Sequence, residues 1–198
     1  MEQITKELQI DCDFETQAAY VYTQQDKYIK KIQDEVETAK QLGIKAEYLE
    51  KIPLDISIKA AIRFDKQAQF HPLKYTAAIA KFITACGGSI YENSSAVDLE
   101  ENHGYVITTQ NGCKVFAKQV IIATHYPFLN KKGMYIAKLY TNRSYVLSIR
   151  TKEKFPGGMY ISAEDPVRSL RYQNINEEQM ILVGGDHHKT GQGADTQT

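Results

Sequence analysis

A run of apolar residues near the middle of the chain, Val120-Ile121-Ile122-Ala123, constrains the fold more than any other feature. The run has no polar face, which is typical of a strand that is covered on both sides of its sheet. Thr124 and His125 follow directly, and Pro127 is expected to stop the strand. Ligands of open α/β sheets bind just outside the carboxyl ends of strands. The sequence therefore predicts a buried strand with a ligand site over Thr124 and His125.

Composition excludes several classes of protein. Lys plus Arg and Asp plus Glu number 24 each, so no net field favours nucleic acid or an anionic membrane surface as a partner. No run approaches the roughly 20 apolar residues of a membrane span. The three cysteines are an odd number without C-x-x-C spacing, which argues against a disulfide framework or a zinc cage and favours a reducing, cytoplasmic location.

Two helices and several strands are predicted from periodicity and from stop signals. Residues 23–26 resemble a capping box and open a helix that ends at Gly43, and a second helix begins at Pro72. Residues 52–64 are expected to be extended, and residues 89–91 form a short predicted strand.

The remainder of the chain favours strands. Asn111-Gly112 is a strong hairpin signal, and it lies within a predicted three-stranded meander that starts near residue 96. After residue 127, an alternating segment at residues 143–149 and short strand-like segments separated by a turn and a polar loop predict an antiparallel sheet of about four strands. We therefore expect an α+β fold, in which residues 1–65 and 128–198 form one subdomain and residues 66–127 form another.

Six stretches together resemble the amino-acid-oxidase type of FAD-dependent oxidoreductase, which includes D-amino-acid oxidase and glycine oxidase. Within this family, the later stretches look closest to a bacterial branch whose members often carry a C-terminal Rieske iron–sulfur domain. The resemblance implies an antiparallel substrate-binding sheet in residues 1–65 and 128–198, and part of a Rossmann-like FAD-binding domain in residues 66–127. It also implies oxidation of an amine or amino-acid-like substrate by hydride transfer to flavin. The stretches are residues 69–75, 87–93, 120–127, 158–162, 169–171 and 183–191.

One motif of the family is missing. The family opens with a strand and a G-x-G-x-x-G turn that binds the FAD pyrophosphate, and no such turn follows a predicted strand here. We therefore expect an internal fragment of the enzyme, which alone would lack most contacts to FAD and would be inactive.

The resemblance places four residues near the cofactor. The position of Val97 offers backbone groups to the adenine, and Ala123, Thr124 and His125 pass close to the dinucleotide. Without the resemblance, Val97 would be interpreted as an ordinary strand residue of the core, and Thr124 as a hydroxyl that bonds its own backbone at a strand end.

Arg171 matches the place where relatives hold a substrate carboxylate, and a guanidinium suits that role because it donates two parallel hydrogen bonds. Arg143 is a second candidate, and Tyr145 could line the same pocket. The alternative for Arg171 is a surface arginine on an edge strand. We predict no catalytic side chain, because hydride transfer to flavin requires none.

Two other interpretations are kept. A metal site built on Asp186, His187 and His188 is disfavoured because adjacent residues of an extended segment point in opposite directions, so we predict no metal ligands. The chain could also be a non-enzymatic α+β binding module with no redox role.

Overall fold

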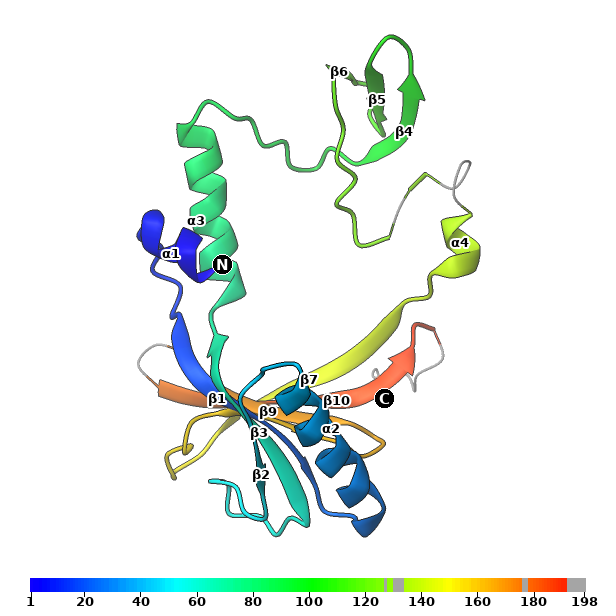
Figure 1. Cartoon of the computed structure of the whole chain (residues 1–198). Helices are drawn as coiled ribbons and strands as arrows, with labels where there is room; N and C mark the ends of the chain where they lie inside the picture. Colours follow the sequence, from blue (N-terminus) through cyan, green and yellow to red (C-terminus); the bar gives the residue numbers. More distant parts are fainter. Residues whose placement is uncertain (127, 130–133, 176–177, 192–198) are drawn as a thin grey trace, which may run out of the picture. The chain divides into compact units, whose positions relative to one another are not determined.

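Strands from both ends of the chain build one seven-stranded sheet in the order β2-β3-β1-β8-β9-β10-β7 (Figure 1). The structure is a computed structural model that describes residues 1–126, 128–129, 134–175 and 178–191. The strands are β1 (Glu15–Thr23), β2 (Ala46–Leu49), β3 (Ala60–Gln69), β7 (Asn142–Arg150), β8 (Met159–Ser162), β9 (Arg168–Ile175) and β10 (Glu178–Lys189). β1 and β8 run parallel, and every other neighbouring pair is antiparallel. The sheet is therefore mixed. A parallel pair is possible here because β1 and β8 are not joined by a hairpin, which would make them antiparallel.

The chain divides into two compact units, which are described separately. Residues Met1–Ile79 and Asn142–Thr198 form the first unit, and residues Ala80–Thr141 form the second. The start of α3 (Pro72–Ala85) is tied to the first unit, because the backbone N–H of His71 donates to the carbonyl oxygen of Cys12 at 2.7 Å and Lys74 pairs with Asp13 at 2.8 Å. The functional assignment of each unit remains a prediction.

One face of the sheet is covered by α2 (Ile29–Gln41), which follows the short 3-10 helix η1 (Asp26–Tyr28). Ile32 and Val36 lie one helical turn apart and are buried against Ala60 and Ile62 of β3. Burial of a side chain such as Ile32 stabilises the fold by about 1.5–3 kcal/mol. The predicted helix and its end at Gly43, where φ is +74°, are confirmed. The predicted capping box at residues 23–26 is wrong, because the Thr23 hydroxyl accepts from the backbone N–H of Gln25 and neither η1 nor α2 has a side-chain cap.

The opposite face is packed by aromatic rings. Tyr20 of β1 stacks on Tyr160 of β8 with 4.7 Å between the ring centroids, and Phe155 meets Tyr160 edge to face at 5.8 Å. Gly158, with φ +81°, lies beside this stack, where an added Cβ would be 2.9 Å from the Tyr20 ring. A glycine is required there because both the backbone conformation and the space exclude a side chain.

The second unit contains the predicted meander, with strand order β4-β5-β6. Its strands are β4 (Ala96–Glu101), β5 (Tyr105–Thr109) and β6 (Lys114–Ala117), and α4 (Tyr135–Lys138) follows them. The turn at Asn111-Gly112 is formed as expected, with Gly112 at φ +78°. Together with the mixed sheet, this meander confirms the predicted α+β class.

The predicted strand over residues 120–123 is wrong. These residues have no regular secondary structure, and Ile121 is 91% exposed. A strand that is buried on both faces needs a paired neighbour, and within the described residues no strand pairs with this run. Thr124 and His125 are accordingly exposed and do not follow a strand end, and Pro127 lies outside the described residues.

Two shorter predictions also fail for lack of a partner. Residues 89–91 are not a strand, and no described strand lies in register with them. Residues 52–59 have no regular secondary structure, with bends at residues 53–56, and the extended strand begins only at Ala60. Of the three free cysteines, Cys12 is buried, whereas Cys86 and Cys113 are exposed.

Candidate substrate-binding groove and cofactor-binding segment

A groove of about 330 Å³ lies on the sheet of the first unit, across β1, β8, β9, β10 and β7. Strand register shows which side chains share its face. Arg171 pairs with Leu182, and Gly184 pairs with both Ser169 and Val146. Directly opposed residues and alternate residues along a strand point to the same side of a sheet. Arg171, Leu182, Ser169 and Val146 therefore line one surface.

This groove occupies the face that α2 covers elsewhere. Val21 pairs with Ile62, which packs under α2, and on its other side with Ile161 of the groove. Ile161 is 41% exposed and Val146 is 65% exposed, so the shelter given by α2 does not extend over β8 and β7. The sheet thus offers an open apolar surface beside a helix-covered one.

Arg171 is the single charged residue among the described residues that line the groove. Its side chain is half-buried, and within the same part of the chain it has no hydrogen-bond or ion-pair partner. A guanidinium keeps its charge and has five N–H donors, so one with no protein partner can bind a carboxylate through two parallel hydrogen bonds. The residue chosen from the sequence is therefore available for an anionic ligand.

The other two predicted substrate residues lie on the opposite face. Tyr145 pairs with Gly185, one position along from the Val146–Gly184 pair, and Arg143 is two residues before Tyr145 on the same strand. The Tyr145 ring stacks against His188, with centroids 5.2 Å apart. The register thus brings neither Arg143 nor Tyr145 to Arg171, and their substrate role remains a prediction.

The face opposite Arg171 carries a carboxylate network that the sequence did not indicate. The Tyr172 hydroxyl donates to Glu15 Oε2, and this oxygen also accepts from Gln69 Nε2 at 3.1 Å and from Gln17 Nε2 at 3.3 Å. Burial, and next the hydrogen bond to Glu15, raise the pKa of Tyr172 to about 12. Because Glu15 and Tyr172 are 157 positions apart, no local pattern could have revealed the pair.

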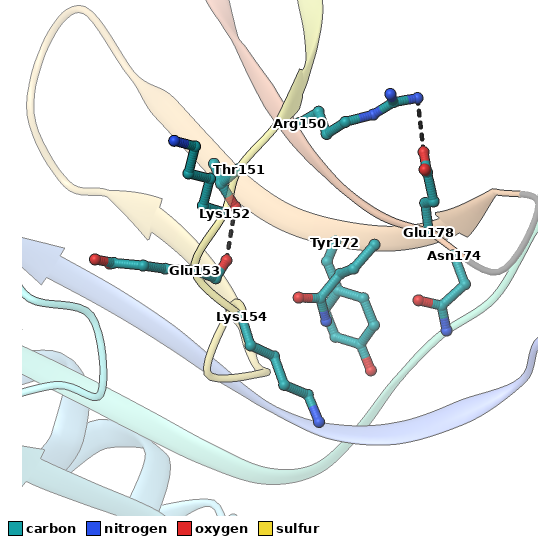
Figure 2. Close-up of a pocket in the computed structure, with 9 residues that line it drawn as sticks. Arg150, Thr151, Lys152, Glu153, Lys154, Tyr172, Asn174 and Glu178 are labelled. Atoms are coloured by element: carbon teal, nitrogen blue, oxygen red, sulfur yellow. Dashed lines mark hydrogen bonds and ion pairs between the residues drawn. The ribbon is translucent and has the colours of Figure 1, made fainter.

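A polar pocket of about 550 Å³ opens beside Tyr172 (Figure 2). Arg150 pairs with Glu178 at 2.6 Å, and the Thr151 hydroxyl donates to the carbonyl oxygen of Glu153 at 2.7 Å. Lys154 and Asn174 also line this pocket. Its ionic groups are exposed and in part paired with each other, so the pocket offers no buried unpaired charge, among the described residues, that would select a ligand.

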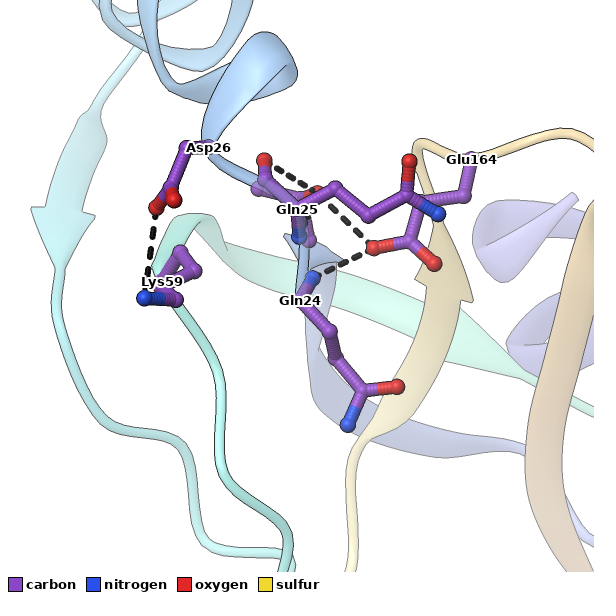
Figure 3. Close-up of polar contacts among 6 residues, drawn as sticks. Gln24, Gln25, Asp26, Lys59 and Glu164 are labelled. Carbon is purple, nitrogen blue, oxygen red and sulfur yellow. Dashed lines mark hydrogen bonds and ion pairs between the residues drawn. The ribbon is translucent and has the colours of Figure 1, made fainter.

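A second carboxylate fixes the entry to α2 (Figure 3). Glu164 Oε1 accepts a hydrogen bond from the Thr23 hydroxyl at 2.9 Å and another from the backbone N–H of Gln24. Asp26 pairs with Lys59 at 3.3 Å in the same region. These contacts connect the loop after β8 to the end of β1, beside the strands that form the groove floor.

All four predicted cofactor residues lie in the second unit. Val97 is the extra residue of a β-bulge, since Ala96 pairs with Thr109 and Asp98 with Thr108. Its backbone groups are therefore outside the regular ladder, and its side chain is 50% exposed. Ala123, Thr124 and His125 form an exposed segment with an accessible backbone. No sequence signal marked the bulge.

The described residues hold neither a cluster of metal ligands nor a membrane-spanning helix. No group of three or more His, Cys, Asp or Glu side chains there could hold a metal ion. The Nδ1 atom of His187 lies 2.6 Å from the Ser144 hydroxyl, and His188 stacks on Tyr145. No helix in this part of the chain is long and apolar enough to cross a membrane.

Residues 1–198 match the family described as DAO, FAD dependent oxidoreductase, so the chain belongs to this family. The resemblance noted in the sequence is thus confirmed at the level of the family.

Individual relatives agree with this assignment. The chain is 39% identical over 190 residues to a Bacillus subtilis (strain 168) protein that carries the name Rieske 2Fe-2S iron-sulfur protein YhfW, covering 96% of this chain and 37% of the relative. The fold of this chain is similar to that of glycine oxidase from Geobacillus kaustophilus. The TM-score is 0.75 and the identity is 15%, with coverage of 95% of this chain and 52% of glycine oxidase. L-Proline dehydrogenase from P. horikoshii matches with a TM-score of 0.72, 18% identity, and coverage of 98% and 54%. The chain therefore spans about half the length of these solved structures.

Proposed function

We propose that this chain forms the substrate-binding sheet and part of the cofactor-binding region of an FAD-dependent enzyme that oxidises an amine or amino acid. One observation carries the proposal: in a chain of this family, Arg171 has no partner among the described residues and lines an open apolar groove. Its guanidinium would hold the substrate carboxylate by two parallel hydrogen bonds. The apolar walls would exclude water and orient the rest of the substrate.

The second unit would contribute to FAD binding. The bulge at Val97 leaves backbone donor and acceptor groups available to an adenine edge, and the segment through Ala123, Thr124 and His125 has an exposed backbone that a phosphate or ribose can approach. When bound, FAD supplies the acceptor for the substrate hydride. This fit is partial, because the sequence has no G-x-G-x-x-G turn to hold the pyrophosphate.

FAD titration tests the cofactor assignment. If the residues present supply only part of the binding site, this chain alone will give no stoichiometric flavin complex, as followed by the visible flavin spectrum and by fluorescence. Robust stoichiometric binding would contradict the need for a glycine-rich turn. Substitution of Val97 by proline, which removes its N–H, would then show whether the bulge takes part.

Arg171 is tested in the intact enzyme. Arg171→Ala should raise KM for carboxylate substrates far more than for neutral amines, because only the former lose an ionic contact. Arg143→Ala tests the second candidate by the same ratio. Arg63→Ala, at an arginine of β3 that pairs with Asp65 at 2.8 Å outside the groove, is the control and should leave the ratio unchanged. Equal effects of Arg171→Ala on both substrate types would remove it from the site.

The relative named as a Rieske protein supports a further element of this proposal. An iron–sulfur domain in the intact protein would accept electrons from the reduced flavin, and the three free cysteines agree with a reducing, cytoplasmic location. The alternative function is a binding module without redox activity. Reading the gene on both sides of this segment separates the two, because the module requires no glycine-rich strand–turn–helix.

A further inference from the structure

We infer that the groove selects substrates that carry an aliphatic side chain beside their carboxylate, in preference to glycine-like or dicarboxylate substrates. This inference rests on the proposed function, since it assumes that Arg171 holds the carboxylate. It adds the chemical class of the side chain, which the family assignment leaves open.

The composition of the walls supports an aliphatic side chain. Val21, Val146, Met159, Ile161 and Leu182 all line the groove, together with the charge of Arg171. A second carboxylate on the substrate would be desolvated against these walls, where the Ser169 hydroxyl is the one side-chain donor besides Arg171 that the register places on this face among the described residues. A cationic side chain would meet only the like charge of Arg171. An aliphatic group loses nothing by leaving water there, and gains about fourfold in affinity for each buried methylene.

Glycine at position 184 keeps the groove floor open. It lies between Ser169 and Val146 in register, and an added Cβ would be 2.7 Å from the Ser169 hydroxyl. At that distance either the hydroxyl or the new side chain must move into the groove. The neighbouring Gly185 faces the other side of the sheet, where a Cβ would meet Arg168 at 2.5 Å. Gly184 therefore bears on the space available to a ligand, whereas Gly185 does not.

The size of the groove agrees with an amino acid larger than glycine. Its volume of about 330 Å³ is at the lower end of the roughly 300–1,000 Å³ typical of small-molecule sites. A glycine-sized ligand would leave the walls formed by Met159, Ile161 and Leu182 without contact. A side chain of several carbons would bury more of these walls than the hydrogen atom of glycine does.

Binding to this chain can be measured without flavin. Acetate, butanoate and hexanoate should bind with affinities that rise about fourfold per methylene, as followed by ligand-observed and amide NMR at millimolar concentrations. Succinate and the neutral amide of hexanoic acid should bind much more weakly than hexanoate. Arg171→Ala should abolish carboxylate binding across the series.

Two neighbouring residues of β7 form a matched pair of variants. Val146 is 65% exposed and faces the groove, whereas Leu147 is 63% exposed and faces the other side of the sheet. Val146→Ser should reduce the preference for hexanoate over acetate by about tenfold, because the ligand chain would no longer pack against the two valine methyl groups. Leu147→Ser should leave that preference unchanged. Neither residue is buried, so both variants should fold.

Each outcome has a distinct meaning. Carboxylate binding that depends on Arg171 but not on chain length or on Val146 would overturn the aliphatic inference and leave the proposed function intact. Succinate binding as tightly as hexanoate would also overturn the inference. Absence of any carboxylate binding would overturn it as well. The proposed function has its own test in the Arg171→Ala kinetics of the intact enzyme.

Discussion

Removal of the Tyr172 hydroxyl tests the carboxylate network behind the groove. In Tyr172→Phe, Glu15 Oε2 loses one of three donors and keeps those of Gln69 at 3.1 Å and Gln17 at 3.3 Å. Gln17 Nε2 also loses the Tyr172 oxygen, which lies 3.2 Å away. A hydrogen bond to a charged group contributes about 1.5–3 kcal/mol. Because Glu15 keeps two donors and the ring is partly exposed, we expect the free energy of unfolding to fall by about 1–2 kcal/mol.

The pH dependence of this loss has a definite sign. Folding raises the pKa of Tyr172 from 10.0 to about 12, so the folded state favours the protonated phenol. This contribution to stability is complete below pH 10 and is lost as the pH rises from about 10 to about 12. A rise in pKa from 10.0 to about 12 corresponds to roughly 2.7 kcal/mol of folding free energy. Because the phenol is partly exposed to solvent, we expect the free energy of unfolding to fall by about 1 kcal/mol over this pH range. Tyr172→Phe should lack this fall in the free energy of unfolding between about pH 10 and about pH 12.

Urea denaturation followed by circular dichroism, at neutral pH and at several pH values above 9, measures both effects. Tyr48→Phe is the control, since Tyr48 is a half-buried tyrosine of β2 in the same sheet and its hydroxyl has no partner among the described residues. Subtracting the two profiles removes the contribution of the other tyrosines. A Tyr172→Phe chain as stable as the wild type, with the same alkaline slope, would refute the network's role.

Two further predictions concern the framework of the first unit. Glu164→Ala removes a carboxylate that accepts two hydrogen bonds at the end of β1 and should cost about 1–2 kcal/mol in urea denaturation, whereas Glu153→Ala, at an exposed loop position, should cost almost nothing. Gly158→Ala and Gly43→Ala both place a side chain at positive φ, but only the former meets the tyrosine stack. We expect about 1–2 kcal/mol for Gly43→Ala and about 2–4 kcal/mol for Gly158→Ala, and equal losses of thermal stability would argue against the steric contribution.

The sequence predicted those elements whose pattern is local. Helix α2 was predicted because Ile32 and Val36 recur at helical spacing and Gly43 stops the helix. The meander was predicted because Asn111-Gly112 allows the backbone conformation of a tight hairpin. The strand β7 was predicted because its residues alternate, and β9 and β10 were predicted as short segments separated by the polar loop at residues 174–179. Each of these signals acts within a few residues.

Features that depend on distant parts of the chain were missed. The parallel pairing of β1 with β8 joins residues about 140 positions apart, and no turn constrains it. The same holds for the bond between Glu15 and Tyr172 and for the opposite faces of Arg171 and Tyr145. Which face a strand residue occupies depends on register, and a single bulge, such as that at Val97, changes it.

The run at residues 120–123 shows a different kind of limit. Its apolar residues favour burial, yet Ile121 is 91% exposed, as Phe116 is at 75% and Phe82 at 46% in the same unit. An apolar pattern indicates that exposing a surface to water is unfavourable. It does not indicate which partner covers that surface. In the first unit such partners are present, since α2 covers β3 and the tyrosine stack covers the other face. In the second unit no described element serves that purpose, and a strand without a neighbour has nothing to form its ladder. The ligand site predicted over Thr124 and His125 therefore requires, as the strand does, a neighbouring strand that pairs with residues 120–123. The groove at Arg171 is formed by strands that are already paired.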